Sequence, residues 1–215
     1  KSGIEGIPKV KTSDNYLTGM KHLITDYGIG ALTPNTIMMK CAEEISPDEQ
    51  KSVQMSDIIR TVFRSKKNLV LVREKEIPEP SRKKTNRSYT IDVWWSKDRV
   101  TGTLMLAFAY LLQTSADWMG ASLRIKSVVE TEREKNGVET YLRDFVQNSR
   151  LKASVEVYLR QNRSTFEIIR EKSKSSGAVF IGMVPPGTHQ THEHYGEYYR
   201  DLLTQTADFP RLFLV

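Results

Sequence analysis

The sequence predicts an α/β protein with two doubly wound, mainly parallel-sheet subdomains. Short apolar runs alternate with longer amphipathic segments, and from residue 89 the order is strand and helix in strict turn. Several apolar runs are continuous, as in strands that helices cover on both faces. Such alternation favours parallel strands joined by right-handed crossovers. We place the first subdomain at 1–88, ending in a Pro-rich basic linker at 78–87, and the second at 89–215.

Four amphipathic segments predict helices with one buried face. Each repeats apolar residues at i, i+3, i+4, i+7 and i+8, which is the helical period. We expect each stripe to face the core and the charged residues to lie opposite. The stripes are Met55–Phe63, Leu104–Leu112, Val138–Val146 and Tyr195–Leu203.

Capping signals mark further helix ends. A helix over Asp14–Tyr27 should end at Gly28, where a left-handed cap favours glycine. The run Ser46–Glu49 offers an N-cap, a proline and an acid, and Ser164 with Glu167 forms a capping-box pattern.

Seven apolar runs predict the strands. Two lie in the first 75 residues and five follow residue 89, so the first subdomain is short and we expect it to be incomplete. The runs are Thr36–Met39, Leu69–Val72, Ile91–Trp95, Leu123–Val129, Ala153–Leu159, Ala178–Val184 and Leu212–Val215.

Composition indicates a soluble, cytosolic protein. The chain is 39% hydrophobic and 27% charged, which is typical of globular domains. Its longest apolar stretch, Leu104–Leu112, is too short to span a bilayer, and Lys1–Val10 lacks the apolar core of a signal peptide. The single cysteine, Cys41, has no partner for an intrachain disulfide, and we expect it to be buried and unreactive.

The net charge of +6 raises the question of an anionic partner. Its densest cluster is Arg82, Lys83, Lys84 and Arg87, in the Pro-bounded linker. We interpret the cluster mainly as a solvated linker, with peripheral contact to anionic lipid as the functional alternative. No aromatic residue interleaves it to stack on bases, so we expect no nucleic-acid binding.

Three of the four histidines lie in one short run, His189–His194. The order H-x-x-H-E-H is neither of the hydrolytic zinc patterns, and its adjacent side chains point to different sides of a helix. We therefore expect a polar helix start and no metal site.

A nucleotide site is the more serious alternative. Doubly wound sheets bind ligands beyond the carboxyl ends of their strands, and the turn Gly182–Gly187 occupies such a place. Gly182 and Gly187 are thus the candidate nucleotide-binding residues. However, the chain has no phosphate-loop or dinucleotide-binding motif, and the two prolines of this turn lack N–H donors. We expect a plain strand-to-helix connection and no cofactor.

No pattern predicts catalysis. The chain has no G-x-S-x-G elbow, and no motif pairs Cys41 with a histidine. Asp92, an acid inside an apolar strand, is better explained by buried hydrogen bonding than by chemistry. We therefore expect that the protein is not an enzyme.

Two motifs carry a family resemblance. Gly28–Met39 (GIGALTPNTIMM) and Thr90–Trp95 (TIDVWW) each join a turn to an apolar run, and Trp118 leads into Leu123–Ile125. With the order of the remaining elements, these motifs resemble the cytosolic carboxy-terminal domain of cation-chloride cotransporters. The remaining elements are Gly177–Val184, Tyr195–Leu203 and Leu212–Val215.

The resemblance implies two subdomains like universal stress proteins, a homodimer, and attachment to the transmembrane domain of the same polypeptide on the cytoplasmic side of the membrane. The domain would then regulate and assemble a secondary transporter, with no catalysis of its own.

Arg82–Arg87 and Tyr195, as an exposed aromatic of the last helix, are interaction candidates. Animal members carry a phosphorylated insertion where this chain has only Arg160–Arg163. The alternative function is a stand-alone nucleotide-binding protein of the universal-stress type.

Overall fold

Each predicted apolar run forms a strand in the computed structural model. The structure describes residues 8, 10–28, 32–41, 49–75, 89–96, 98–149 and 151–215. The strands are β1 (Thr36–Lys40), β2 (Asn68–Glu74), β3 (Thr90–Trp94), β4 (Ser122–Val129), β5 (Ala153–Leu159), β6 (Ala178–Ile181) and β7 (Arg211–Leu214).

Helices separate most of these strands, as the periodicity predicts. From residue 89 onward, strand and helix alternate without exception, and a short 3-10 turn, η2, follows the first helix of this part. The helices are α1 (Tyr16–Asp26), α2 (Glu49–Arg64), α3 (Arg99–Thr114), α4 (Glu132–Ser149), α5 (Thr165–Ser173) and α6 (His192–Gln205), and η2 is Ala116–Trp118.

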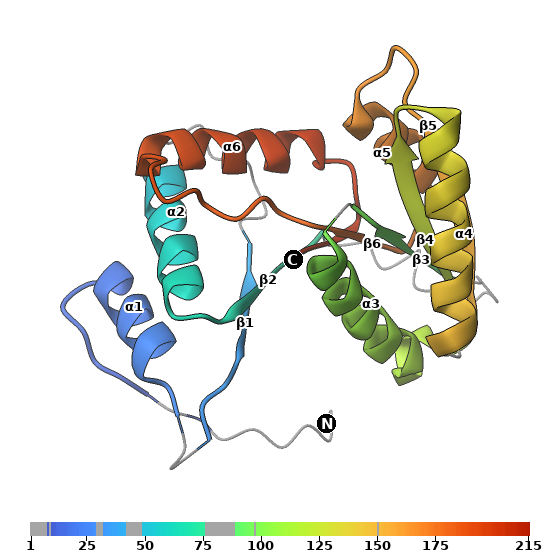
Figure 1. Cartoon of the computed structure of the whole chain (residues 1–215). Helices are drawn as coiled ribbons and strands as arrows, with labels where there is room; N and C mark the ends of the chain where they lie inside the picture. The colour runs from blue at the N-terminus through green and yellow to red at the C-terminus, as the bar shows by residue number, and fades with distance from the viewer. Residues whose placement is uncertain are drawn as a thin grey trace.

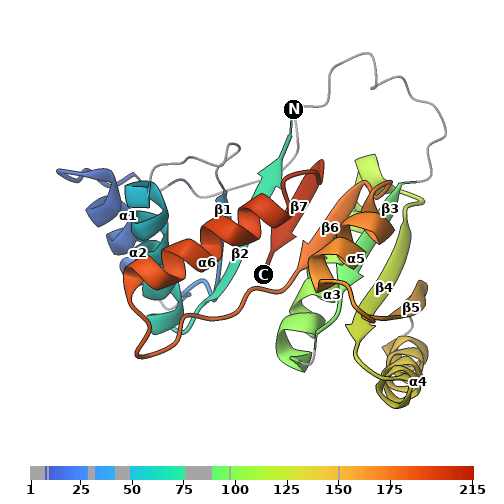
Figure 2. The ribbon, with the colours of Figure 1, turned by 90° about the horizontal axis from the view of Figure 1, so that it is seen from above.

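The strands form one sheet in the order β1-β2-β7-β6-β3-β4-β5. Figure 2 shows this order from one side of the sheet to the other. Neighbours pair in parallel except β2 and β7, where Leu71 lies opposite Leu214 in an antiparallel pair. The prediction of a mainly parallel α/β sheet is confirmed.

Strands from both predicted subdomains share this sheet. β1 and β2 come from residues 1–88, and the other five strands come from 89–215. The single antiparallel pair, β2 with β7, is the junction between the two groups. The boundary at 88/89 falls between β2 and β3, and the division into two subdomains stays a prediction. The linker at 78–87 lies outside the described residues.

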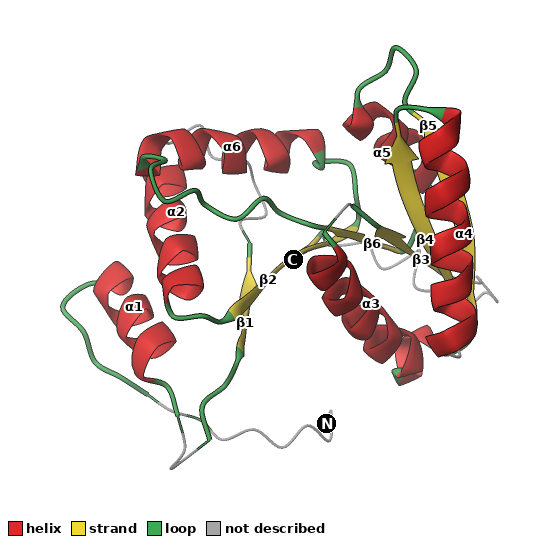
Figure 3. Cartoon of the chain, in the orientation of Figure 1, coloured by secondary structure: helices red, strands yellow, loops and turns green. Residues whose placement is uncertain are grey.

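Two hydrophobic clusters lie on opposite faces of the sheet. Alternate residues of one strand enter different clusters: Leu69 and Leu71 of β2 join one, while Val70 joins the other. The first cluster includes residues of α1, α2, α5 and α6, and the second includes residues of α3 and α4. In Figure 1, α6 lies above the central strands and α3 below them, and Figure 3 shows the same arrangement by element type.

The helix cap predicted for one helix is present, and the cap predicted for another is not. Ser164 and Glu167 form the predicted capping box of α5. Gly28, however, does not adopt a left-handed conformation, so that prediction is wrong: α1 ends at the extended residue Tyr27, and Lys67 donates to the carbonyl of Ile24. The buried ammonium group of Lys67, a residue distant in sequence, thus caps the C-terminal end of α1. Ser46–Asp48 lie outside the described residues.

The buried stripe of α3 is not the predicted one. Its buried residues are Gly102, Met105, Leu106 and Ala109. Within the predicted stripe, Leu104–Leu112, Leu111 is 61% exposed and Ala107 is also exposed. The predictions for the other three helices hold at Ile58, Leu142 and Leu202, which are all buried, but Phe63, at the end of the α2 stripe, is 37% exposed. α3 is apolar on nearly every side, so periodicity cannot decide which stripe meets the sheet.

Candidate functional site

The loop between β6 and α6 holds both glycines predicted for a nucleotide. Gly182 follows β6 at the carboxyl end of the sheet, and Gly187 lies in the exposed part of the loop. A phosphate here would need free N–H groups. Instead, Met183 N donates to Val215 O at 2.7 Å and Val184 N to the hydroxyl of Tyr198 at 2.8 Å.

Other polar groups of the loop also form hydrogen bonds with groups of the same chain. The N–H of Gly187 donates to Gln190 Oε1 at 3.2 Å. Arg60, a residue of α2 that is 5% exposed, donates to the carbonyl oxygens of Gly187, Gln190 and Thr191. The loop therefore presents carbonyl groups to a cation of this chain rather than N–H groups to an anion. This arrangement weighs against phosphate binding at Gly182 and Gly187.

A cavity of about 430 Å³ does lie at the carboxyl ends of β3 and β4. Trp95 and Tyr141 line it together with Arg99, Ser127 and Glu130. The Arg99 guanidinium lies over the Tyr141 ring, 4.5 Å from its centre. Neither Gly182 nor Gly187 lines this cavity, so the structure does not bring the predicted nucleotide residues to it.

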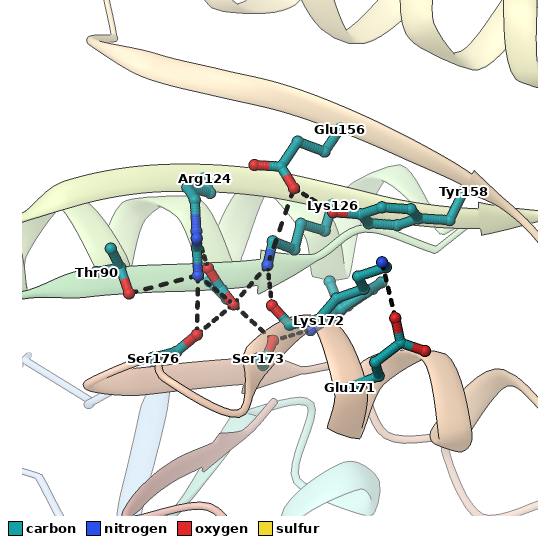
Figure 4. Close-up of polar contacts among 11 residues, drawn as sticks. Thr90, Arg124, Lys126, Glu156, Tyr158, Glu171, Lys172, Ser173 and Ser176 are labelled. Carbon is teal, nitrogen blue, oxygen red and sulfur yellow. Dashed lines mark hydrogen bonds and ion pairs between the residues drawn. The ribbon is translucent and has the colours of Figure 1, made fainter.

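A constellation of charged side chains surrounds the buried carboxylate of Asp92. Asp92 lies on β3, which pairs with β4, the strand that carries Arg124 and Lys126. Arg124 donates to both carboxylate oxygens, at 2.6 and 3.0 Å, and Lys126 Nζ donates to Oδ2 at 2.9 Å. Ser173, at the end of α5, and Ser176 also donate to Oδ2. Figure 4 shows Arg124 and Lys126 on their strand, facing Ser173 and Ser176 at and just after the end of α5.

A second layer of contacts surrounds this cluster. Trp94 Nε1 donates to the hydroxyl of Ser173 at 3.0 Å, and Lys126 also donates to the carbonyl of Lys172 in α5. On β5, Glu156 Oε2 lies 4.0 Å from Lys126 Nζ and accepts a hydrogen bond from Tyr158. Two cations and two carboxylates thus balance one another on one face of the sheet.

The environment keeps Asp92 ionised. Burial is the largest single influence and would raise its pKa, but hydrogen bonds from Arg124, Ser173, Ser176 and Lys126 together outweigh it and lower the pKa. For Lys126, burial is also the largest influence and lowers the pKa, because desolvation disfavours the ammonium.

The two charged groups at the centre of the Asp92 cluster are closed to solvent. Asp92 is 0% exposed and Lys126 is 1% exposed, so neither charged group is open to a substrate in this structure. Every oxygen and ammonium of the pair is already hydrogen-bonded, as buried charges require. This geometry agrees with the expected buried, hydrogen-bonding role of Asp92.

The remaining predicted site residues do not converge. Tyr195 is 1% exposed and its hydroxyl donates to Val184 O at 2.8 Å, so the expectation of an exposed aromatic there is wrong. The helical period places it on the core-facing stripe of α6, where the ring packs and the hydroxyl finds a carbonyl. Arg82, Lys83, Lys84 and Arg87 lie outside the described residues.

Within the described parts of the chain, no group of three or more histidine, cysteine or acidic residues is placed to hold a metal ion. No helix in those parts combines the length and apolar character needed to cross a membrane.

Sequence comparison points to one family. The potassium/chloride cotransporter 3 of Caenorhabditis elegans is 32% identical to this chain over 114 residues, which is 53% of this chain and 10% of that protein. The chain resembles a cation-chloride cotransporter. It spans only about a tenth of the length of this curated relative, and no protein-family model matches it.

Solved structures agree on the fold. The cytoplasmic domain of a prokaryotic cation chloride cotransporter matches 92% of this chain and 68% of its own, with a TM-score of 0.54 and 16% identity. A universal stress protein from Archaeoglobus fulgidus DSM 4304 matches 84% of this chain and 60% of its own, with a TM-score of 0.55 and 12% identity. The predicted resemblance to a cotransporter cytoplasmic domain with a universal-stress-type fold is confirmed.

Sequence reasoning missed the partners of Asp92 and the exposed side of α3. The first left a signal, since Arg124 and Lys126 alternate along an otherwise apolar strand and so point to one face beside Asp92. The exposed side of α3 also left a signal in the sequence, because Arg99 is the only charged residue in this helix. With its one charge at the first position, the helix has no charged face to mark the side that meets water.

Proposed function

We propose that this chain is the cytosolic regulatory and assembly domain of a secondary-active cation-chloride cotransporter, with no catalysis of its own. The observation that carries the proposal is the 32% identity to a potassium/chloride cotransporter, in a chain whose fold matches a cotransporter cytoplasmic domain over 92% of its length. The chain would lie on the cytoplasmic side of the membrane, joined to the transmembrane domain of the same polypeptide.

Regulation has a definite physical requirement. The domain can change transport only if it binds the inward-open and outward-open states with different free energy, because equal contact shifts no equilibrium. The interior supports a scaffold that passes on such a difference as a rigid unit: Asp92, Arg124 and Lys126 tie β3 to β4, and their serine partners tie the sheet to α5.

The test uses the complete polypeptide that carries this chain, reconstituted in liposomes. We expect uptake of rubidium, a potassium analogue, that requires chloride on the same side. Removal of the 215-residue domain should change the uptake rate while the remaining protein stays in the membrane. Uptake that ignores chloride, or that is the same without the domain, would contradict the proposal.

A second candidate function is nucleotide binding of the universal-stress type. The cavity at the carboxyl ends of β3 and β4 favours it, since doubly wound sheets bind ligands at that edge. Nucleotide binding would raise the melting temperature as ATP is added, by an amount set by affinity. Our primary proposal predicts no such shift at millimolar ATP, and the measurement separates the two.

A further inference from the structure

α3 carries two apolar stripes: one is buried in the core, and only Leu104 of the other packs against it. The buried stripe packs on the sheet through Met105, Leu106 and Ala109. On the opposite side, Val100 is 78% exposed and Leu111 is 61% exposed. A helix that is apolar on all sides is normally covered on all sides. The outer stripe of α3 therefore has the composition of an interface.

The spacing of the outer stripe is regular. Val100, Leu104, Ala107, Leu111 and Thr114 follow one another at intervals of four, three, four and three residues. This is the 3.5-residue period of helices that pack side by side along their length. With 16 residues, α3 is about 24 Å long, enough for three turns of contact.

The surface beside this stripe is also apolar. Leu104 and Phe108 are half-buried against the same cluster as Val72 of β2 and Phe213 of β7. Met38 of β1 is 57% exposed. The sheet register places these strand residues on one face, since Val72 pairs with Phe213 and Met38 with Val70.

That sheet face and α3 lie on the same side of the molecule. Among the described helices, α2 and α6 pack on the opposite side of β2 and β7, and the cluster on this side draws its helical residues from α3 and α4. Figure 1 shows α3 below the central strands and α6 above them. The outer stripe of α3 thus adjoins an apolar strand surface.

We propose that the outer stripe of α3 is the surface through which two copies of this chain pair. The distribution of charge favours a second copy of this chain as the partner. The chain carries a net charge of +6, so two copies repel on average, whereas residues 100–114 of α3 include no charged side chain. A two-fold axis brings one patch against the same patch of its copy, so a neutral stripe pairs with itself without placing like charges together.

Side-chain size agrees with this pairing. Thr103 and Ala107, near the middle of the exposed side, are small, so two α3 helices can approach closely there, while Val100 and Leu111 supply apolar contact toward the ends. The inference rests on the proposed function in one respect: it names the surface through which that assembly domain pairs.

The test is the mass of the whole 215-residue chain in solution, by sedimentation velocity from micromolar to hundreds of micromolar concentration. We expect a monomer–dimer equilibrium for the parent chain. Ala107→Glu and Leu111→Glu should each weaken the dimer about tenfold or more, because a carboxylate is buried without a partner. The matched control, Thr140→Glu, adds the same charge at an exposed site of α4 and should leave the equilibrium unchanged.

Disulfide formation tests the geometry directly. In a Cys41→Ser background, Ala107→Cys should give a covalent dimer with copper-phenanthroline and oxygen, whereas Thr140→Cys should not. Circular dichroism and urea midpoints check that each variant folds. A parent chain that stays monomeric, or glutamate variants that pair like the parent, would overturn the inference. So would a monomer that binds phosphatidylcholine–phosphatidylserine vesicles through Leu111.

The two proposals fail separately. Chloride-dependent rubidium uptake by a complete protein whose domain is monomeric would reject the α3 surface and retain the function. A dimer that Leu111→Glu disrupts, in a protein without such uptake, would retain the surface and reject the function.

Discussion

Asp92 shows how a charge becomes part of a protein core. It is fully buried, yet two cations and two hydroxyl groups neutralise and solvate its carboxylate. The partners come from β4, the end of α5 and the turn after it, so one side chain joins three parts of the molecule. Removing a single member of such a group leaves an uncompensated charge in a medium of low dielectric constant.

Asp92→Asn should therefore be strongly destabilising. The asparagine has nearly the same shape but no charge, so Lys126, which is 1% exposed, loses its closest carboxylate. We expect the free energy of unfolding to fall by about 3–5 kcal/mol, measured by urea denaturation. Glu139→Gln is the control: it breaks the surface pair with Arg143 and should cost less than about 0.5 kcal/mol. A loss of similar size in both variants would refute the structural role of Asp92.

The parent chain and Asp92→Asn should also differ in how their unfolding free energy depends on pH. The folded pKa of Asp92 is lowered, so its stabilising effect is complete above the unfolded value of about 3.9 and is lost as the pH falls through the folded value. The difference in unfolding free energy between the parent and Asp92→Asn should hold from neutral pH to about pH 5 and shrink below pH 4. A difference that grows on acidification would contradict the assignment.

At the scale of helices, buried cations serve as C-terminal caps. Lys67 donates to Ile24 O of α1, Lys126 to Lys172 O of α5, and Arg73 to Leu203 O of α6. All three side chains are less than 9% exposed. The last carbonyls of a helix have no partner within it and carry the negative end of its dipole. Part of the net positive charge is therefore internal and needs no anionic partner.

A pair of glycines tests the close packing of α3. A Cβ on Gly102 would lie 2.7 Å from the Trp95 ring, whereas a Cβ on Gly137, in the first half of α4, would meet nothing within 4 Å. Gly102→Ala should cost about 1–3 kcal/mol through overpacking. Gly137→Ala should gain about 1 kcal/mol, because alanine favours a helix more than glycine does. Thermal melts of the two variants measure both effects, and equal shifts would disprove the close contact at Trp95.

The positions of the strands and helices could be predicted from the sequence, but fewer of the contacts that their side chains make could be. Short apolar runs identify strands because a buried strand must be apolar, and that rule located β1 to β7 within a few residues. The core stripe of α3 could not be chosen, because its other side is equally apolar. The burial of Tyr195 and the partners of Asp92 depend on which strands and loops lie side by side, which is a property of the whole chain.

At the scale of the whole molecule, β7 holds the two groups of strands together. It is the last strand in sequence, yet it lies between β2 and β6 and pairs with both. α6, which precedes it, packs on α2 from the other group. The loop before α6 is held by Arg60 of α2. Residues 192–215 are therefore shared between the first and second predicted subdomains.

This sharing predicts that the chain unfolds as one unit. Cys41 follows β1 and is 2% exposed, with a pKa raised by burial, so its thiol reports the first group of strands. All three tryptophans, Trp94, Trp95 and Trp118, report the second. In urea, thiol labelling and tryptophan fluorescence should give the same midpoint, as two-state unfolding requires. If the thiol became reactive at clearly lower urea, the two predicted subdomains would be separate cooperative units, and β7 would then fail to couple them.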